Sequence, residues 1–89
     1  MNTSAKIQMA IKYTSAELQK LYATRESRIT NRRMISAYEA MSNMAAKYQL
    51  SDIGEENYLK YLNSCLDPQN HEPSDPYYIA AENVLKAIQ

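Results

Sequence analysis

The sequence predicts an all-α protein, a small antiparallel bundle of about four helices with a helix turn near residues 25–33. The only glycine and all three prolines lie beyond residue 50, so the first part of the chain lacks the strongest helix breakers. Apolar residues recur at spacings of three and four in separate segments, as on one face of a helix. No pair of alternating segments indicates strands. We therefore expect one helical domain over residues 1–89.

The first predicted helix begins at Asn2, Thr3 or Ser4, since each of these side chains can cap a helix. Thr14 and Glu17 also have the spacing of a capping box, which would allow a kink and a restart there. The apolar face keeps its phase across Thr14, so we favour one helix that ends at about residues 23–27. This mostly apolar face consists of Ile7, Ile11, Thr14, Leu18, Leu21, Tyr22 and Arg25.

A second apolar face lies nearly half a turn out of phase with the first, taking about 100° per residue. A turn within residues 25–33 would let both faces contact a common core. The alternative is one rod over residues 4–49 that buries opposite faces against different neighbours and requires an oligomer. We prefer the turn. The second face consists of Met34, Ile35, Ala37, Tyr38, Met41, Ala45 and Tyr48.

The third helix is expected to follow residues 49–52, with Asp52 and Glu55 as its capping box. Residues 66–76 form a Pro-rich, polar segment and are predicted to be a loop. Asp75 before Pro76 is a typical start of a helix, so the last helix is predicted over residues 76–88. The apolar faces of these two helices consist of Tyr58, Leu59, Leu62, Cys65 and Leu66, and of Tyr77, Ala80, Ala81, Val84, Leu85 and Ile88.

The composition indicates a thin core. Leu, Ile and Val together number only fifteen of 89 residues, Phe and Trp are absent, and bulk comes from eight Tyr and five Met. A chain of this size is near the limit at which a single core suffices, so we expect a homodimer interface to supply further burial. The single cysteine excludes an internal disulfide, and no apolar run is long enough for a membrane. We therefore expect a cytoplasmic protein with no membrane association.

Charge is distributed unevenly along the chain. Residues 1–33 contain seven basic and two acidic residues, whereas residues 34–89 contain three basic and eight acidic residues. The two halves could fold onto each other, pair between subunits or steer an outside ligand.

The densest basic cluster is the segment 25–33, and it is the predicted partner-binding site. With a turn there, two arginines would end the first helix, and Arg32 and Arg33 would begin the second, where the helix dipole disfavours positive charge. Glu55, Glu56 or Asp75 could neutralise them internally, or a partner could supply carboxylates or phosphates. The adjacent tyrosines at 77 and 78 point about 100° apart on a helix, so one of them can contact a partner. The candidate residues are Arg25, Arg28, Arg32, Arg33, Tyr77 and Tyr78.

Catalytic equipment is not evident in the sequence. His71 is the only histidine and is expected to be exposed in the loop, while Cys65 is expected to be a buried, inert thiol. No spacing indicates a metal site, and one glycine cannot form a Gly-rich phosphate loop. Helix capping accounts for the paired acids Glu55 and Glu56, and solubility of the loop accounts for Asp67, Glu72 and Asp75. We predict no catalytic residue, no metal and no cofactor, hence no enzyme.

The sequence therefore favours a small non-catalytic interaction protein that binds an acidic surface of another protein. A regulator, an inhibitor, an immunity-type factor and a chaperone-like subunit all fit this description. The alternative is a nucleic-acid-binding regulator that uses the same arginines on phosphates. Against that alternative stand the zero formal net charge and the lack of zinc-finger spacing, a basic zipper or an RNP-like strand. A helix-turn-helix within residues 14–48 is conceivable, but its turn would lack the common glycine.

Overall fold

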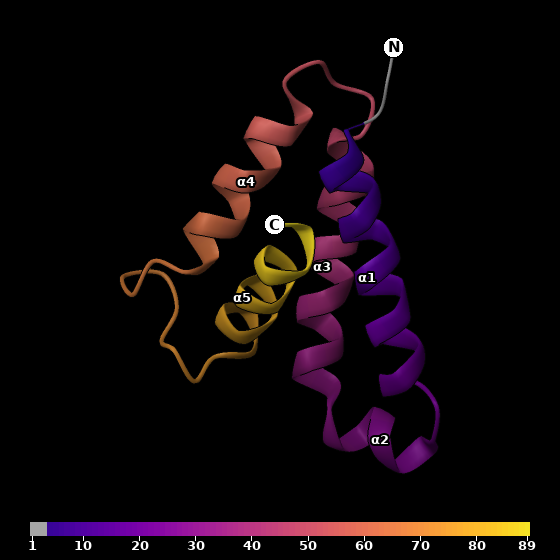
Figure 1. Cartoon of the computed structure of the whole chain (residues 1–89). Coiled ribbons are helices and arrows are strands. Elements are labelled where there is room, and N and C mark those ends of the chain that lie inside the picture. Colours follow the sequence, from indigo (N-terminus) through magenta and orange to yellow (C-terminus); the bar gives the residue numbers. More distant parts are fainter. Residues whose placement is uncertain (1–3) are drawn as a thin grey trace.

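A computed structural model of the chain describes residues 4–89, and over this range the fold is all-α (Figure 1). The described residues form five helices rather than about four, because the turn region contains a short helix of its own. The helices are α1 (Ala5–Leu21), α2 (Arg25–Thr30), α3 (Arg32–Tyr48), α4 (Gly54–Cys65) and α5 (Pro76–Ile88). No strand occurs within residues 4–89.

Helix α1 is one unbroken helix. Ser4 is its N-cap and accepts a hydrogen bond from the backbone N–H of Ile7. The other two candidate caps, Asn2 and Thr3, lie outside the described residues. Thr14 does not start a new helix: its buried hydroxyl donates to the carbonyl of Ala10 at 2.8 Å, as is usual for a threonine inside a helix. The alternative of a kink and restart at Thr14 is therefore wrong, and the favoured single helix is confirmed at this position.

The chain turns between α1 and α3, so the alternative of one rod is wrong. Helix α1 ends at Leu21, earlier than the predicted residues 23–27, because the Thr24 side chain accepts from the N–H of Ser27 and starts α2. Residues of α2 then reach back to the end of α1. Ser27 Oγ donates to the Leu21 carbonyl at 2.8 Å, and the Arg28 guanidinium donates to the Tyr22 carbonyl at 3.0 Å. These bonds satisfy carbonyls that the end of a helix leaves without partners.

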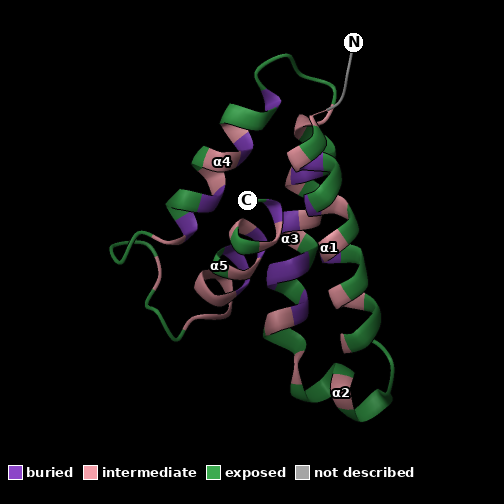
Figure 2. Ribbon diagram, in the orientation of Figure 1, coloured by how far each residue is buried: buried purple, intermediate pink, exposed green. Residues whose placement is uncertain are grey.

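Helices α1, α3, α4 and α5 enclose one core. The turn at α2 brings α1 antiparallel alongside α3 in the most extensive helix pairing, and α5 packs against α1, α3 and α4 (Figure 1). Buried residues face the space where these helices meet, whereas α2 has none (Figure 2). The predicted apolar faces are confirmed except at Tyr22, which is 42% exposed, and at Arg25, which is exposed on α2. The core cluster comprises Ile7, Ala10, Ala37, Tyr38, Met41, Ala45, Tyr58, Leu62, Cys65, Ala80, Ala81, Val84 and Ile88.

Tyrosine fills this core because its hydroxyl groups find partners. Tyr58 is fully buried and donates to the carbonyl of Met41 at 3.0 Å. The Tyr38 hydroxyl accepts from the side-chain amide of Asn83 at 3.1 Å, which links α3 to α5. Burial raises the pKa of Tyr58, which further disfavours ionisation of this hydroxyl.

The connection between α3 and α4 depends on the only glycine. A Cβ atom at Gly54 would lie against the backbone carbonyl of Tyr48, far inside van der Waals contact. The predicted Asp52–Glu55 capping box is wrong: Ile53 is the N-cap of α4, with no side-chain capping bond. Glu55 instead accepts a hydrogen bond from Ser4, which ties the start of α4 to the start of α1. The close approach of two backbones, rather than capping chemistry, therefore fixes this corner.

None of the helices in the described range is both long and apolar enough to cross a membrane.

Replacing Gly54 with Ala is expected to destabilise the fold by about 1–3 kcal/mol, since the methyl group must displace backbone. Urea unfolding monitored by circular dichroism measures this loss. The matched control is Asn43→Ala at an exposed position of α3, which should cause no loss of stability because alanine favours a helix more than asparagine does. Equal stability of the Gly54→Ala protein would show that the backbones of α3 and α4 are not in contact at this corner.

Candidate partner-binding site

The site forms where the first turn of α3 meets the start of α5. Helix α5 begins as the sequence predicts, with Pro76 at its first position and Asp75 as its N-cap. Oδ1 of Asp75 accepts from the N–H of Tyr77 at 2.8 Å. Arg32 and Arg33 begin α3, as predicted, and no side chain caps that helix. Two positive residues thus occupy a helix start where the dipole disfavours them.

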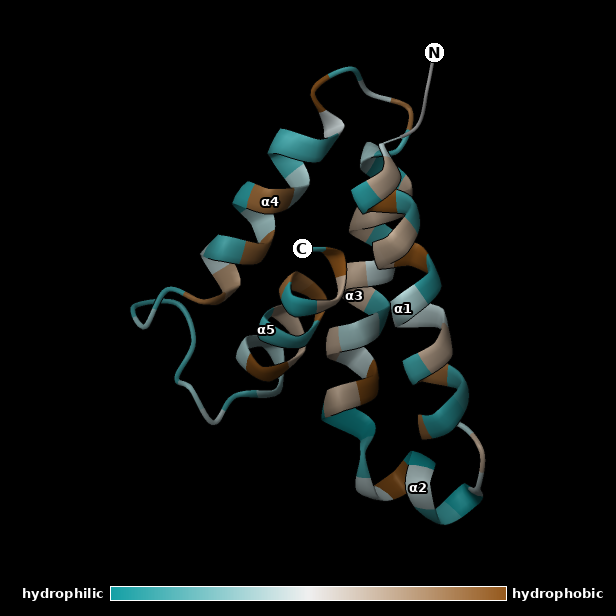
Figure 3. Ribbon diagram, viewed as in Figure 1, coloured by the Kyte–Doolittle hydropathy of each residue, from teal (hydrophilic) through white to brown (hydrophobic). Residues whose placement is uncertain are grey.

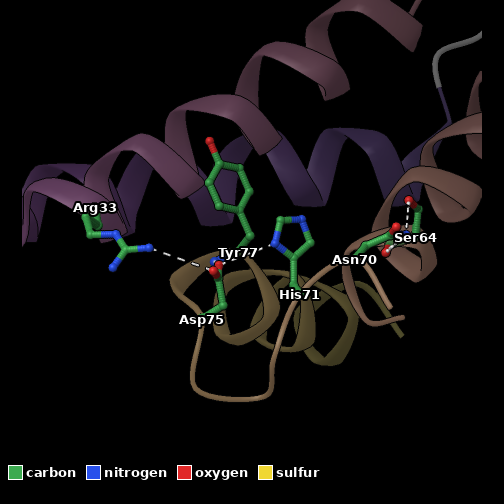
Figure 4. A network of polar contacts seen from close by, with 6 residues as sticks. All are labelled: Arg33, Ser64, Asn70, His71, Asp75 and Tyr77. Atoms are coloured by element: carbon green, nitrogen blue, oxygen red, sulfur yellow. Dashed lines mark hydrogen bonds and ion pairs between the residues drawn. The ribbon is translucent and has the colours of Figure 1, made fainter. Parts of the chain in front are cut away.

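Asp75 is the centre of a polar network that joins the two helix starts (Figure 4). Its Oδ2 lies 3.9 Å from a guanidinium nitrogen of Arg33, and its Oδ1 lies 3.5 Å from Nδ1 of His71. The His71 ring stacks on the ring of Tyr77, with 5.3 Å between centroids. The prediction that His71 is exposed is thus wrong, because this stacking and the Asp75 contact leave its side chain only 30% accessible.

A small hollow of about 180 Å³ lies beside this network. It is lined by Arg32, Arg33 and Ser36 of α3 and by Pro76 and Tyr77 of α5. Two arginines, a serine, a proline and a tyrosine therefore line one hollow. Three of the six predicted site residues, Arg32, Arg33 and Tyr77, meet here.

The other three predicted residues lie outside the hollow. Arg25 and Arg28 are exposed on α2, and Arg28 already binds the Tyr22 carbonyl, so part of its role is structural. Hydrophilic residues dominate α2 and the start of α3 (Figure 3). Tyr78 is half-buried on α5, whereas Tyr77 packs against the core, so the adjacent tyrosines do have different surroundings. Arg25 and Arg28 thus extend the basic surface beyond the hollow.

Only one of the three acids considered as internal partners lies near the arginines. Glu55 bonds to Ser4 and Glu56 pairs with Lys60, so both are engaged elsewhere. Asp75 contacts Arg33 at 3.9 Å, but the Arg33 side chain is 82% exposed. Such an exposed pair contributes about 0–1 kcal/mol. The protein's own carboxylates therefore neutralise the cluster only weakly.

The described residues offer little reactive chemistry around this site. Cys65 is buried, and burial raises the pKa of its thiol, which disfavours the reactive thiolate. Within residues 4–89, no three His, Cys, Asp or Glu side chains gather in a way that could hold a metal ion. The arrangement at the hollow suits binding of a negatively charged group.

Sequence reasoning named Asp75 as a possible internal partner of the arginines but missed Ser36, Pro76 and His71 as members of the site. Ser36 follows Arg32 by one helical turn, so extending the face of Arg32 by four residues would have found it. The other two depend on the distance between α3 and the segment that leads into α5. No local pattern encodes that distance.

A second, shallower hollow of about 320 Å³ lies between α1 and the end of α5, and it is lined by Met9, Lys12, Tyr13, Ala16 and Ala87. Met9 is 45% exposed there, and the lining is mostly apolar.

No protein-family model matches the chain, and no curated protein and no solved structure matches it either.

Proposed function

We propose that this chain is a small non-catalytic interaction protein that binds an acidic surface of another protein. The binding surface is the end of the bundle that carries α2 and the starts of α3 and α5. Binding would block or stabilise the partner, as a regulator, an inhibitor, an immunity-type factor or a chaperone-like subunit does.

One observation carries this proposal: Arg32 and Arg33 share a hollow with Tyr77 and have little internal neutralisation. Arg and Tyr are enriched in protein interfaces and among the residues that contribute most to binding. The only ion pair between the four arginines and another described residue is the long contact of Arg33 with Asp75. A partner carboxylate would relieve the unfavourable charge at the start of α3.

A protein partner is better supported than a nucleic acid. The chain has ten basic and ten acidic residues, whereas nucleic-acid-binding domains usually carry an excess of positive charge.

We also propose that the protein acts as a homodimer in the cytoplasm. The exposed apolar hollow around Met9 supports self-association, since a second copy could cover it. The free thiol of Cys65 fits a reducing compartment.

Replacing Arg32 and Arg33 together with Ala is expected to weaken partner binding at least about tenfold, which corresponds to ~1.4 kcal/mol. The tagged full-length chain serves for affinity purification with quantitative mass spectrometry. A partner found in this way is then purified, and its dissociation constant is measured at two salt concentrations. Circular dichroism checks that both proteins remain helical.

The matched control removes two exposed charges elsewhere, with Lys60→Ala and Lys86→Ala on α4 and α5. This variant should bind the partner as the wild type does. Equal loss in both variants, or no loss in either, would contradict the proposed role of the arginine surface. Tight binding of a DNA or RNA oligonucleotide that weakens steeply with salt would favour the nucleic-acid alternative.

Sedimentation velocity is expected to show a dimer at high micromolar concentration, and Met9→Glu should shift it to monomer by placing a charge in the apolar hollow. Gln19→Glu, an exposed change on α1 that adds the same charge, is the control. A wild-type protein that remains monomeric throughout this range has no such dimer.

A further inference from the structure

We propose that the hollow between α3 and α5 receives a single carboxylate side chain from an acidic peptide segment of the partner. In the free protein, the carboxylate of Asp75 would be the one that lies near Arg33. This inference rests on the proposed function and specifies the chemistry of its contact.

The size of the hollow selects a side chain. Its volume of about 180 Å³ is well below the roughly 300–1,000 Å³ typical of pockets for small-molecule ligands and cofactors. A hollow of this size suits one side chain.

The residues that line the hollow suit a carboxylate group on an apolar stem. Arg32 and Arg33 line the hollow, and their planar guanidinium groups can match a carboxylate at its edge through paired hydrogen bonds. Pro76 and Tyr77 supply apolar surface for methylene groups. Glutamate combines both features, and the hydroxyl of Ser36 is a further donor on the α3 side.

Asp75 shows that a carboxylate is suited to Arg33 and also why Arg33 remains available. Its Oδ1 is held by the Tyr77 N–H at 2.8 Å and lies near His71, because Asp75 must cap α5. This anchoring leaves Oδ2 at 3.9 Å from Arg33, beyond hydrogen-bonding distance. A partner carboxylate free of that anchor can approach closer and replace the internal contact at low cost.

The test is an NMR titration of the full-length ¹⁵N-labelled chain with two synthetic peptides, N-acetyl-Leu-Glu-Leu-amide and its Gln counterpart. The glutamyl peptide should cause saturable shifts of the backbone and side-chain signals of Arg32, Arg33, Ser36 and Tyr77. The glutaminyl peptide has nearly the same shape but no charge, and should bind at least about fivefold more weakly, about 1 kcal/mol.

Two variants sharpen the test. Arg33→Gln should lower the affinity for the glutamyl peptide severalfold. Arg25→Gln, the same change on α2, should leave that affinity within about twofold of the wild-type value. Asp75→Asn should strengthen binding severalfold, because it removes the competing charge. Asparagine caps helices about as well as aspartate, so α5 and the melting temperature should be preserved.

Several results would overturn the inference. These are equal binding of the two peptides, shifts spread evenly over all arginines, unchanged or weaker binding by the Asp75→Asn protein, and tighter binding of inorganic phosphate than of the glutamyl peptide. If the partner depends on Arg32 and Arg33 but the peptide does not bind, only the carboxylate hollow is wrong. If the peptide binds as described but no partner depends on these arginines, only the proposed function is wrong.

Discussion

The structure depends on the phase difference between the apolar faces of α1 and α3. A straight helix through residues 4–48 would direct these faces to opposite sides, and a chain this small has no second core to cover the other one. The turn at α2 resolves the conflict by laying α1 antiparallel against α3. Thr24 starts α2, and Ser27 and Arg28 bind the last carbonyls of α1. The break therefore occurs without leaving those backbone groups unpaired.

The same turn determines the position of the candidate site. Because α3 restarts at Arg32, two arginines stand in its first turn rather than in the middle of a longer helix. Helix α5 packs on α3 with its own start nearby, so Asp75 caps one helix and approaches the first turn of the other. Its Oδ1 accepts from the Tyr77 N–H at 2.8 Å, whereas its Oδ2 lies 3.9 Å from Arg33. This weak neutralisation of Arg33 is the physical basis of the proposed partner contact.

Periodicity predicted the helices and nearly every buried residue, and the Asp75–Pro76 pair predicted the start of α5, since these signals are local. Packing overrode other local signals. The capping-box pattern at Thr14 lies on a helix face that stays buried, so no new helix begins there. The capping-box pattern at Asp52 does not form, and the close backbone contact at Gly54 fixes the start of α4 instead. A six-residue helix such as α2 carries too little periodicity to be identified. The arginines and Tyr77 could be selected by residue type, but their meeting with Ser36 depends on how the loop before α5 returns to α3.

The most direct test of the turn is a distance between its two flanking helices. Spin labels at Gln8→Cys on α1 and Ala46→Cys on α3, in a Cys65→Ala background, allow this measurement by pulsed electron resonance. Dilution with unlabelled chain restricts it to distances within one molecule. Packed antiparallel helices about 8–10 Å apart predict a single distribution centred below about 30 Å, label linkers included. A distribution centred near 57 Å, about 1.5 Å per residue of continuous helix, would contradict the account.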